Sequence, residues 1–180
     1  MKKAMIFALI ACLLCCAALA EGSPAPTSMI QLVTPTPTAA PLGTVFSNED
    51  LIVTLPYGME ILSAEDLQGY EAAVQNDYPN SAHTLLVAKD ESGAFITFSA
   101  AEMTMDALSA AREAAREILS TDDVVQEKTF GENSYACFVC AIGDQQYRIY
   151  YLAGEGRMLV IGASGLEESA IENMLSGIVF

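Results

Sequence analysis

The sequence has no tryptophan, one histidine and few basic side chains, and each shortage narrows what the chain can do. Eight lysines and arginines stand against 23 aspartates and glutamates, which gives a formal net charge of −15 at pH 7. Nucleic-acid binding needs a basic surface to neutralise phosphates, so this charge argues against it. The charge also argues against electrostatic docking on anionic lipid, while a soluble acidic surface or a basic partner is compatible with it.

The common catalytic motifs are missing as well. A Ser/His/acid site would have to use His83, yet the chain has no G-x-S-x-G elbow, no G-x-G-x-x-G and no P-loop. Gly162-Ala163-Ser164-Gly165 is a distorted version of the elbow, and Ser164 is better explained as a helix cap. We therefore assign no catalytic and no cofactor-binding residue, and expect that the protein is not an enzyme.

Three pairs of adjacent carboxylates lie in predicted loops, and none has the D-x-D-x-D-G pattern of a calcium loop. Turn and cap chemistry accounts for them, so no metal ligand is assigned. Two alternatives stay open, a secreted hydrolase that uses His83 or a carboxylate pair and a calcium-dependent surface module. The pairs are Glu49-Asp50, Asp90-Glu91 and Asp122-Asp123.

Cys137 and Cys140 form a C-x-x-C motif inside a run of strand-forming residues, 134–142. Residues three apart on a strand point to opposite faces and are about 10 Å apart along it. A disulfide needs Cα atoms within about 7 Å. The other three cysteines, Cys12, Cys15 and Cys16, are lost with a signal peptide that is cleaved after Ala20, so no second pair remains to complete a zinc site. We predict two buried thiols.

The N-terminus is typical of a cleavable secretory signal peptide over residues 1–20. Lys2 and Lys3 precede an uncharged apolar run, and Ala18-Leu19-Ala20 supplies the small residues of a cleavage site. Removal of this segment removes two lysines and no acidic residue, so the net charge becomes −17 over 160 residues.

A second processing route is lipidation. Leu9-Ile10-Ala11-Cys12 resembles a bacterial lipobox, in which the cysteine carries the lipid and becomes the first residue. Cleavage there would leave apolar residues 13–19 on the mature protein, whereas cleavage after Ala20 removes them. We favour a free protein that begins at Glu21, with a membrane-anchored lipoprotein as the alternative; lipidated Cys12 would be its membrane attachment.

Residues 21–44 are predicted to be a disordered linker, because the repeat Thr34-Pro-Thr-Pro-Thr38 and its neighbours favour extended backbone and bury little apolar surface. Residues 45–180 are predicted to form a single α+β domain, an antiparallel sheet meander with two to three helices packed on it. The expected strands are 51–55, 84–88, 94–98, 124–130, 134–142, 146–153 and 157–163, and the expected helices are 63–75, 104–118 and a last one after residue 164.

Caps and the chain end complete this prediction. Ser63-Ala-Glu-Asp66 and Ser164-Gly-Leu-Glu167 are predicted as capping boxes, and Thr104 as the cap of the middle helix, with Asp106 favourable to its dipole. The apolar tail Ile178-Val-Phe180 is expected to dock on the sheet edge.

One predicted strand carries three tyrosines and an arginine. Alternation places Tyr147 and Tyr151 on one face, and Arg148 and Tyr150 on the other. Arg148 and Tyr150 could line a binding surface, although a half-buried sheet face is the simpler interpretation.

The order of elements resembles the PsbP-like group, which includes bacterial secreted proteins and lipoproteins. The resemblance covers residues 45–180 and rests on the strand and turn Leu55-Pro56-Tyr57-Gly58, the helix before a meander, and the ending Leu175-Ser-Gly-Ile-Val-Phe180. The chain departs from the pattern at Met59, where relatives often have tryptophan. The resemblance implies an α/β/α sandwich and a non-catalytic accessory role.

We therefore expect an exported, non-catalytic binding or assembly module of the bacterial cell envelope or exterior. Its partner would be a protein or another component of the cell envelope, and no cofactor is implied.

Overall fold

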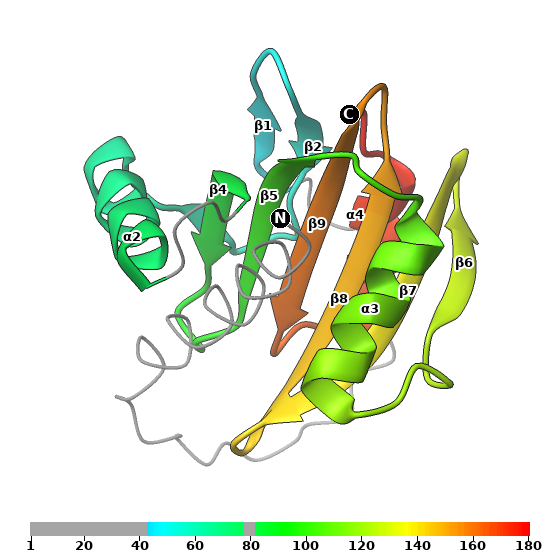
Figure 1. Ribbon diagram of the computed structural model, residues 1–180. Coiled ribbons are helices and arrows are strands. Elements are labelled where there is room, and N and C mark those ends of the chain that lie inside the picture. Colours follow the sequence, from blue (N-terminus) through cyan, green and yellow to red (C-terminus); the bar gives the residue numbers. More distant parts are fainter. Residues whose placement is uncertain (1–42, 78–81) are drawn as a thin grey trace, which may run out of the picture.

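The computed structural model describes residues 43–77 and 82–180, so the predicted signal peptide, the lipobox and nearly all of the predicted linker lie outside the described residues. A seven-stranded sheet forms the middle layer, with every neighbouring pair antiparallel and the order β3-β4-β5-β9-β8-β7-β6 (Figure 1). The strands are β3 (Glu60–Ile61), β4 (His83–Lys89), β5 (Phe95–Glu102), β6 (Gln126–Phe130), β7 (Asn133–Ile142), β8 (Gln145–Ala153) and β9 (Arg157–Ser164).

Different elements cover the two faces of this sheet. Helices α2 (Ala64–Asp77) and α3 (Ala107–Leu119) pack on one face, hereafter the α3 side. Helix α4 (Glu168–Ser176) and a separate two-stranded sheet of β1 (Val45–Ser47) and β2 (Ile52–Thr54) pack on the other, hereafter the α4 side. The fold is thus α+β, with three described helices on an antiparallel sheet, as the sequence predicted.

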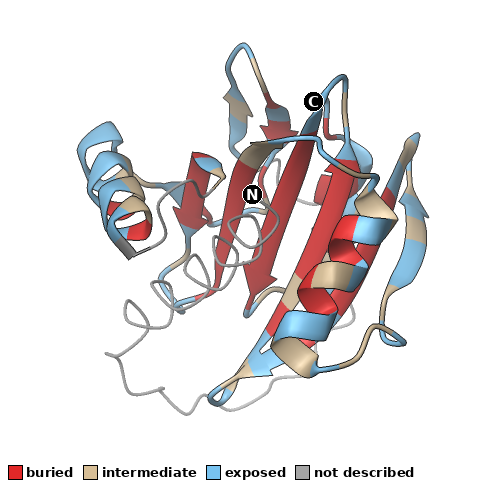
Figure 2. Ribbon diagram, viewed as in Figure 1, coloured by how far each residue is buried: buried red, intermediate tan, exposed pale blue. Residues whose placement is uncertain are grey.

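Successive residues of a strand point to opposite faces of the sheet. The apolar side chains of the central strands therefore contribute to the hydrophobic cores on both the α3 side and the α4 side. Figure 2 shows that the strands in the middle of the sheet are buried along most of their length. On the α3 side the sheet meets a small-residue stripe of α3, which lets this helix approach closely. That stripe consists of Ala110, Ala111, Ala114 and Ala115.

The predicted meander is confirmed, with strand ends that differ by two residues or fewer. The hairpin between β4 and β5 is confirmed too. Asp90 closes its turn, since the backbone N–H groups of Ser92 and Ala94 each donate 2.8 Å hydrogen bonds to its carboxylate. Ser63 caps α2 as predicted, because its Oγ accepts a 3.1 Å bond from the N–H of Asp66.

Two predicted caps are wrong. Helix α3 is capped by Asp106 and not by Thr104, since the Asp106 carboxylate accepts a 2.9 Å bond from the N–H of Ser109. Ser164 is the last residue of β9, is buried, and donates through Oγ to the carbonyl oxygen of Gln146 at 2.9 Å. Helix α4 therefore begins later, at Glu168, and its N-cap residue Glu167 makes no side-chain cap bond.

The C-terminal tail also differs from its prediction. Val179 pairs with Ile52 of β2 through bonds of 2.9 and 3.0 Å, so the tail extends the small sheet and does not join the edge of the large one. The short strands β1 and β3 were not predicted. None of the helices within 43–77 and 82–180 has the length and apolarity needed to cross a bilayer.

Candidate functional site

One member of each carboxylate pair in the predicted loops already has a structural partner. Asp50 forms an ion pair with Arg157, and Asp122 accepts a 2.6 Å bond from Nη2 of Arg116. Asp90 closes the β4–β5 turn. Within the part of the chain that the structure describes, no three His, Cys, Asp or Glu side chains gather closely enough to hold a metal ion.

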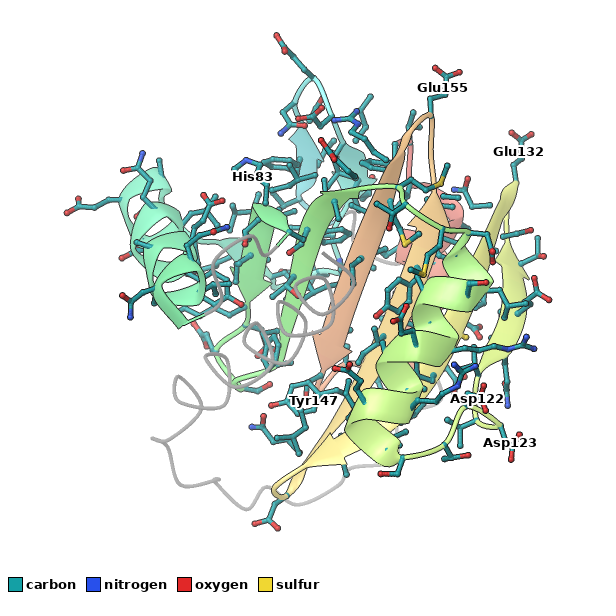
Figure 3. All side chains as sticks on the ribbon, in the orientation of Figure 1. His83, Asp122, Asp123, Glu132, Tyr147 and Glu155 are labelled. Carbon is teal, nitrogen blue, oxygen red and sulfur yellow. The ribbon has the colours of Figure 1, made fainter. Side chains whose placement is uncertain are left out.

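His83 lies at the start of β4 and pairs through Nδ1 with Glu71 of α2. Its side chain is 66% exposed, so nothing in this pairing shields a reacting group from water. Figure 3 shows His83 on one side of the molecule, with Asp122 and Asp123 on the other. His83 and the Asp122-Asp123 pair are therefore not brought together.

The two cysteines are buried free thiols, as the strand pattern predicted. Cys137 belongs to the core of the α4 side and Cys140 to that of the α3 side. Burial raises the pKa of the Cys140 thiol to about 11 and raises that of Cys137. Both groups are therefore protonated at neutral pH, which is the opposite of what a redox-active thiol needs.

The predicted alternation along β8 is present in the structure. Tyr147 and Tyr151 point into the core of the α3 side, and Tyr150 points to the α4 side. Arg148 lies on the α4 side together with Tyr150, where the two residues line one cleft.

This cleft, which we call the Arg148 cleft, is a hollow of about 300 Å³ beside the first residue of α4. It exists because α4 is only nine residues long and leaves the far part of this sheet face uncovered. Val139, in the middle strand of the cleft floor, is 45% exposed as a result. The lining residues are Val124, Gln126, Lys128, Cys137, Phe138, Val139, Arg148, Tyr150 and Glu168.

Arg148 is the half-buried cation of this cleft. Its Nη1 donates a long, 3.4 Å bond to the carbonyl oxygen of Leu166, and no carboxylate of the described residues lies within ion-pair distance. An arginine without a carboxylate is notable in a chain of net charge −15. Arg148 also lines a second, more open hollow of about 430 Å³ together with Asp144 and Ser164.

Tyr150 supplies a hydroxyl to the same cleft. Its side chain is 4% exposed and packs edge-on against Phe130 and Tyr135, with ring centroids 6.4 and 6.2 Å away. Among the described residues its hydroxyl makes no hydrogen bond and is not one of the buried unpaired atoms, so it is open to a ligand in the cleft. Burial raises the pKa of Tyr150 to about 12, and the Arg148 charge partly offsets that rise.

Lys128 and Glu168 close the cleft from β6 and α4. Their 3.3 Å ion pair joins residues 40 apart in sequence. The pair leaves Arg148 as the cation with free donors at this site. The guanidinium of Arg148, the hydroxyl of Tyr150 and the apolar side chains of the floor are suited to hold a ligand.

Sequence reasoning placed Arg148 and Tyr150 on one face but missed Lys128 and Glu168. Nothing in the local sequence of either residue signals their meeting, because it depends on how α4 packs beside β6.

Comparison with known proteins gives a likeness in structure only. No family model matches the sequence, and no curated protein matches it. A solved cyanobacterial PsbP from Synechocystis (CyanoP) is similar with a TM-score of 0.52 at 11% identity, over 82% of this chain and 96% of that one. The chain therefore has a PsbP-like fold, as the sequence resemblance implied.

A crystal structure from Bacteroides thetaiotaomicron is similar with a TM-score of 0.49 at 10% identity. The likeness covers 76% of this chain and 48% of that one, so this chain spans about half the length of that protein.

Proposed function

We propose that this protein is an exported, non-catalytic binding or assembly module of the bacterial cell envelope or exterior, and that it binds its partner through the Arg148 cleft. The observation that carries the proposal is a pair of polar groups without adequate partners. Arg148 has only a long bond to a carbonyl oxygen, and the Tyr150 hydroxyl, which is not among the buried unpaired atoms, has no bond among the described residues. A bound ligand with acceptor oxygens would form hydrogen bonds with both groups.

Export is supported by the N-terminal sequence, in which two lysines, an apolar run and a small-residue site follow in order. The test is expression of the full chain in a bacterium, followed by fractionation and mass spectrometry of the N-terminus. We expect a protein outside the cytoplasm that begins at Glu21. An N-terminus at a lipidated Cys12 would show that the protein is a membrane-anchored lipoprotein and not a free protein. An uncleaved chain that begins at Met1 and is found in the cytoplasm would overturn export.

The non-catalytic part is tested separately with a panel of ester, peptide and glycoside substrates. We expect turnover that is indistinguishable from that of His83→Ala and from a buffer blank. Turnover that His83→Ala abolishes would make the protein a hydrolase and would remove the proposal. Binding is tested by capture from an envelope extract, in which Arg148→Gln should lose the partner that the native protein retains.

A further inference from the structure

The chemistry of the Arg148 cleft also indicates what kind of group it holds. We infer that the cleft is a site for a carboxylate that carries a short aliphatic chain. This inference rests on the proposed function, since it uses the same cleft, and it adds the class of ligand.

The positive end of the site is Arg148. A guanidinium presents parallel N–H donors that match the two oxygens of a carboxylate, and it stays charged at every working pH. Its present bond to Leu166 uses one nitrogen at a distance of 3.4 Å, so most of its donors are free for a ligand. The remaining cation of the cleft, Lys128, is engaged with Glu168.

Tyr150 lies two residues further along the same strand and on the same side, which places it about 6–7 Å from Arg148 along the backbone. A phenol that stays protonated at neutral pH acts as a donor toward an anion. Both residues line the same cleft and present donors to it from one strand.

The charge of the site favours one negative charge on the ligand. Arg148 contributes one unpaired positive charge, while Glu168 and Glu172 lie close enough to act on Tyr150. A monovalent carboxylate matches one guanidinium and meets less repulsion from the two glutamates than a phosphate dianion would. The electrostatics thus favour a carboxylate over inorganic phosphate.

The rest of the lining is apolar and accepts a hydrocarbon chain. Val124 and Val139 are 40% and 45% exposed, and Cys137 contributes a protonated thiol. The volume of about 300 Å³ is at the small end of ligand sites, which suits a short chain. Burial of these side chains by a ligand would add a hydrophobic contribution to the ionic one.

The test uses the processed protein with hexanoate, hexan-1-ol and inorganic phosphate as probes, followed by two-dimensional NMR of the backbone amides. We expect hexanoate to shift amides of 124–128, 137–139 and 148–150, with an affinity at least ten times that for hexan-1-ol or phosphate. Equal binding of hexan-1-ol, or tighter binding of phosphate at these amides, would overturn the inference.

Variants assign the effect to the cleft. Arg148→Gln should weaken hexanoate binding at least tenfold, and Tyr150→Phe several-fold. Arg112→Gln is the matched control, since Arg112 is an exposed arginine of α3 on the other side of the sheet, and its binding should be unchanged. If Arg148→Gln does not fold, Arg148→Lys is used in its place. Lysine keeps the positive charge but lacks the parallel N–H donors of the guanidinium, so weaker hexanoate binding is expected again.

Unchanged binding in the Arg148 variant, or an equal loss in Arg112→Gln, would contradict the assignment. Failure of hexanoate to bind would overturn the inferred ligand class, but it would not change the results of the N-terminal mass measurement or of the turnover panel. The ligand class can therefore fail while the proposed function stands.

Discussion

The hydroxyl of Tyr135 donates a buried 2.7 Å hydrogen bond to the carbonyl oxygen of Leu175, and this bond ties β7 to the end of α4. Tyr150 is the neighbouring tyrosine in the same aromatic cluster, and its hydroxyl has no such partner among the described residues. The two tyrosines therefore share an environment and differ in hydrogen bonding.

This difference predicts opposite results for two matched substitutions. Tyr135→Phe should lower the free energy of unfolding by about 1 kcal/mol, because a buried bond is lost. Tyr150→Phe should leave it nearly unchanged, since it removes a hydroxyl that makes no hydrogen bond within the described residues. Urea denaturation followed by circular dichroism measures both. A clear loss of stability in Tyr150→Phe would mean that the hydroxyl has a partner in the folded protein.

Gly131 and Gly143 are a second matched pair. Both have a φ of +60°, which side chains disfavour, but they differ in what surrounds them. A Cβ on Gly131 would lie 2.5 Å from the carbonyl oxygen of Ser176, whereas a Cβ on Gly143 would meet nothing within 4 Å. Gly143→Ala should cost about 1 kcal/mol for the backbone conformation.

Gly131→Ala should cost more, by about 1–3 kcal/mol, because the turn between β6 and β7 must move away from α4. Thermal unfolding of both variants measures the difference. Equal costs would show that the end of α4 does not press on this turn.

Asp106 predicts a pH dependence. The hydrogen bonds from the backbone and side chain of Ser109 lower the pKa of Asp106 below 3.8. A carboxyl with a lowered pKa stabilises the fold above its unfolded pKa, and this contribution is lost as the pH falls through the folded value.

Asp106→Ala should therefore lower the unfolding midpoint at pH 7, while Asp106→Asn should lower it less, because asparagine is also a good N-cap. The gap between native protein and Asp106→Asn should shrink as the pH falls below about 4. A gap that is constant from pH 7 to pH 3 would contradict a role for the ionised carboxylate.

The buried thiols predict slow alkylation. With a pKa of about 11, Cys140 has roughly one-hundredth of the thiolate at pH 8 that a thiol with the ordinary value of 9.0 has. Iodoacetamide should therefore modify Cys140 about a hundredfold more slowly in the folded protein than in urea, or more slowly still because burial also limits access. Mass spectrometry of the peptide that contains Cys137 and Cys140 gives both rates. Rapid modification of the folded protein would indicate frequent opening of this strand.

The regular parts of the fold could be predicted because each depends on neighbours in sequence. Strands β6 to β9 follow from alternating apolar residues between glycine turns, and the faces of Arg148 and Tyr150 follow from the same alternation. The helix caps were harder to predict from the sequence than the strands, for a physical reason. Ser164 fits the pattern of a capping box, but its position between β5 and β8 satisfies more backbone groups as a strand.

The candidate site was less predictable, because it depends on helix α4 being too short to cover its whole face of the sheet. The cleft exists where α4 leaves the sheet uncovered, and its rim joins Lys128 to Glu168 across 40 residues. Neither the length of the uncovered floor nor this pairing can be derived from spacing in the sequence. Figure 3 shows that His83, Asp122 and Tyr147 lie in separate parts of the molecule.

The position of β9 between β5 and β8 has a consequence for how the chain folds. Phe95 of β5 pairs with Ser164 of β9, so the centre of the sheet joins residues 69 apart, and its formation closes a large loop. The hairpin of β4 and β5 cannot be completed into the sheet until nearly the whole chain is available. Folding should accordingly be slow for a protein of this size, on the order of milliseconds to seconds. A chain that is synthesised from its N-terminus would remain unfolded until its last strands have emerged.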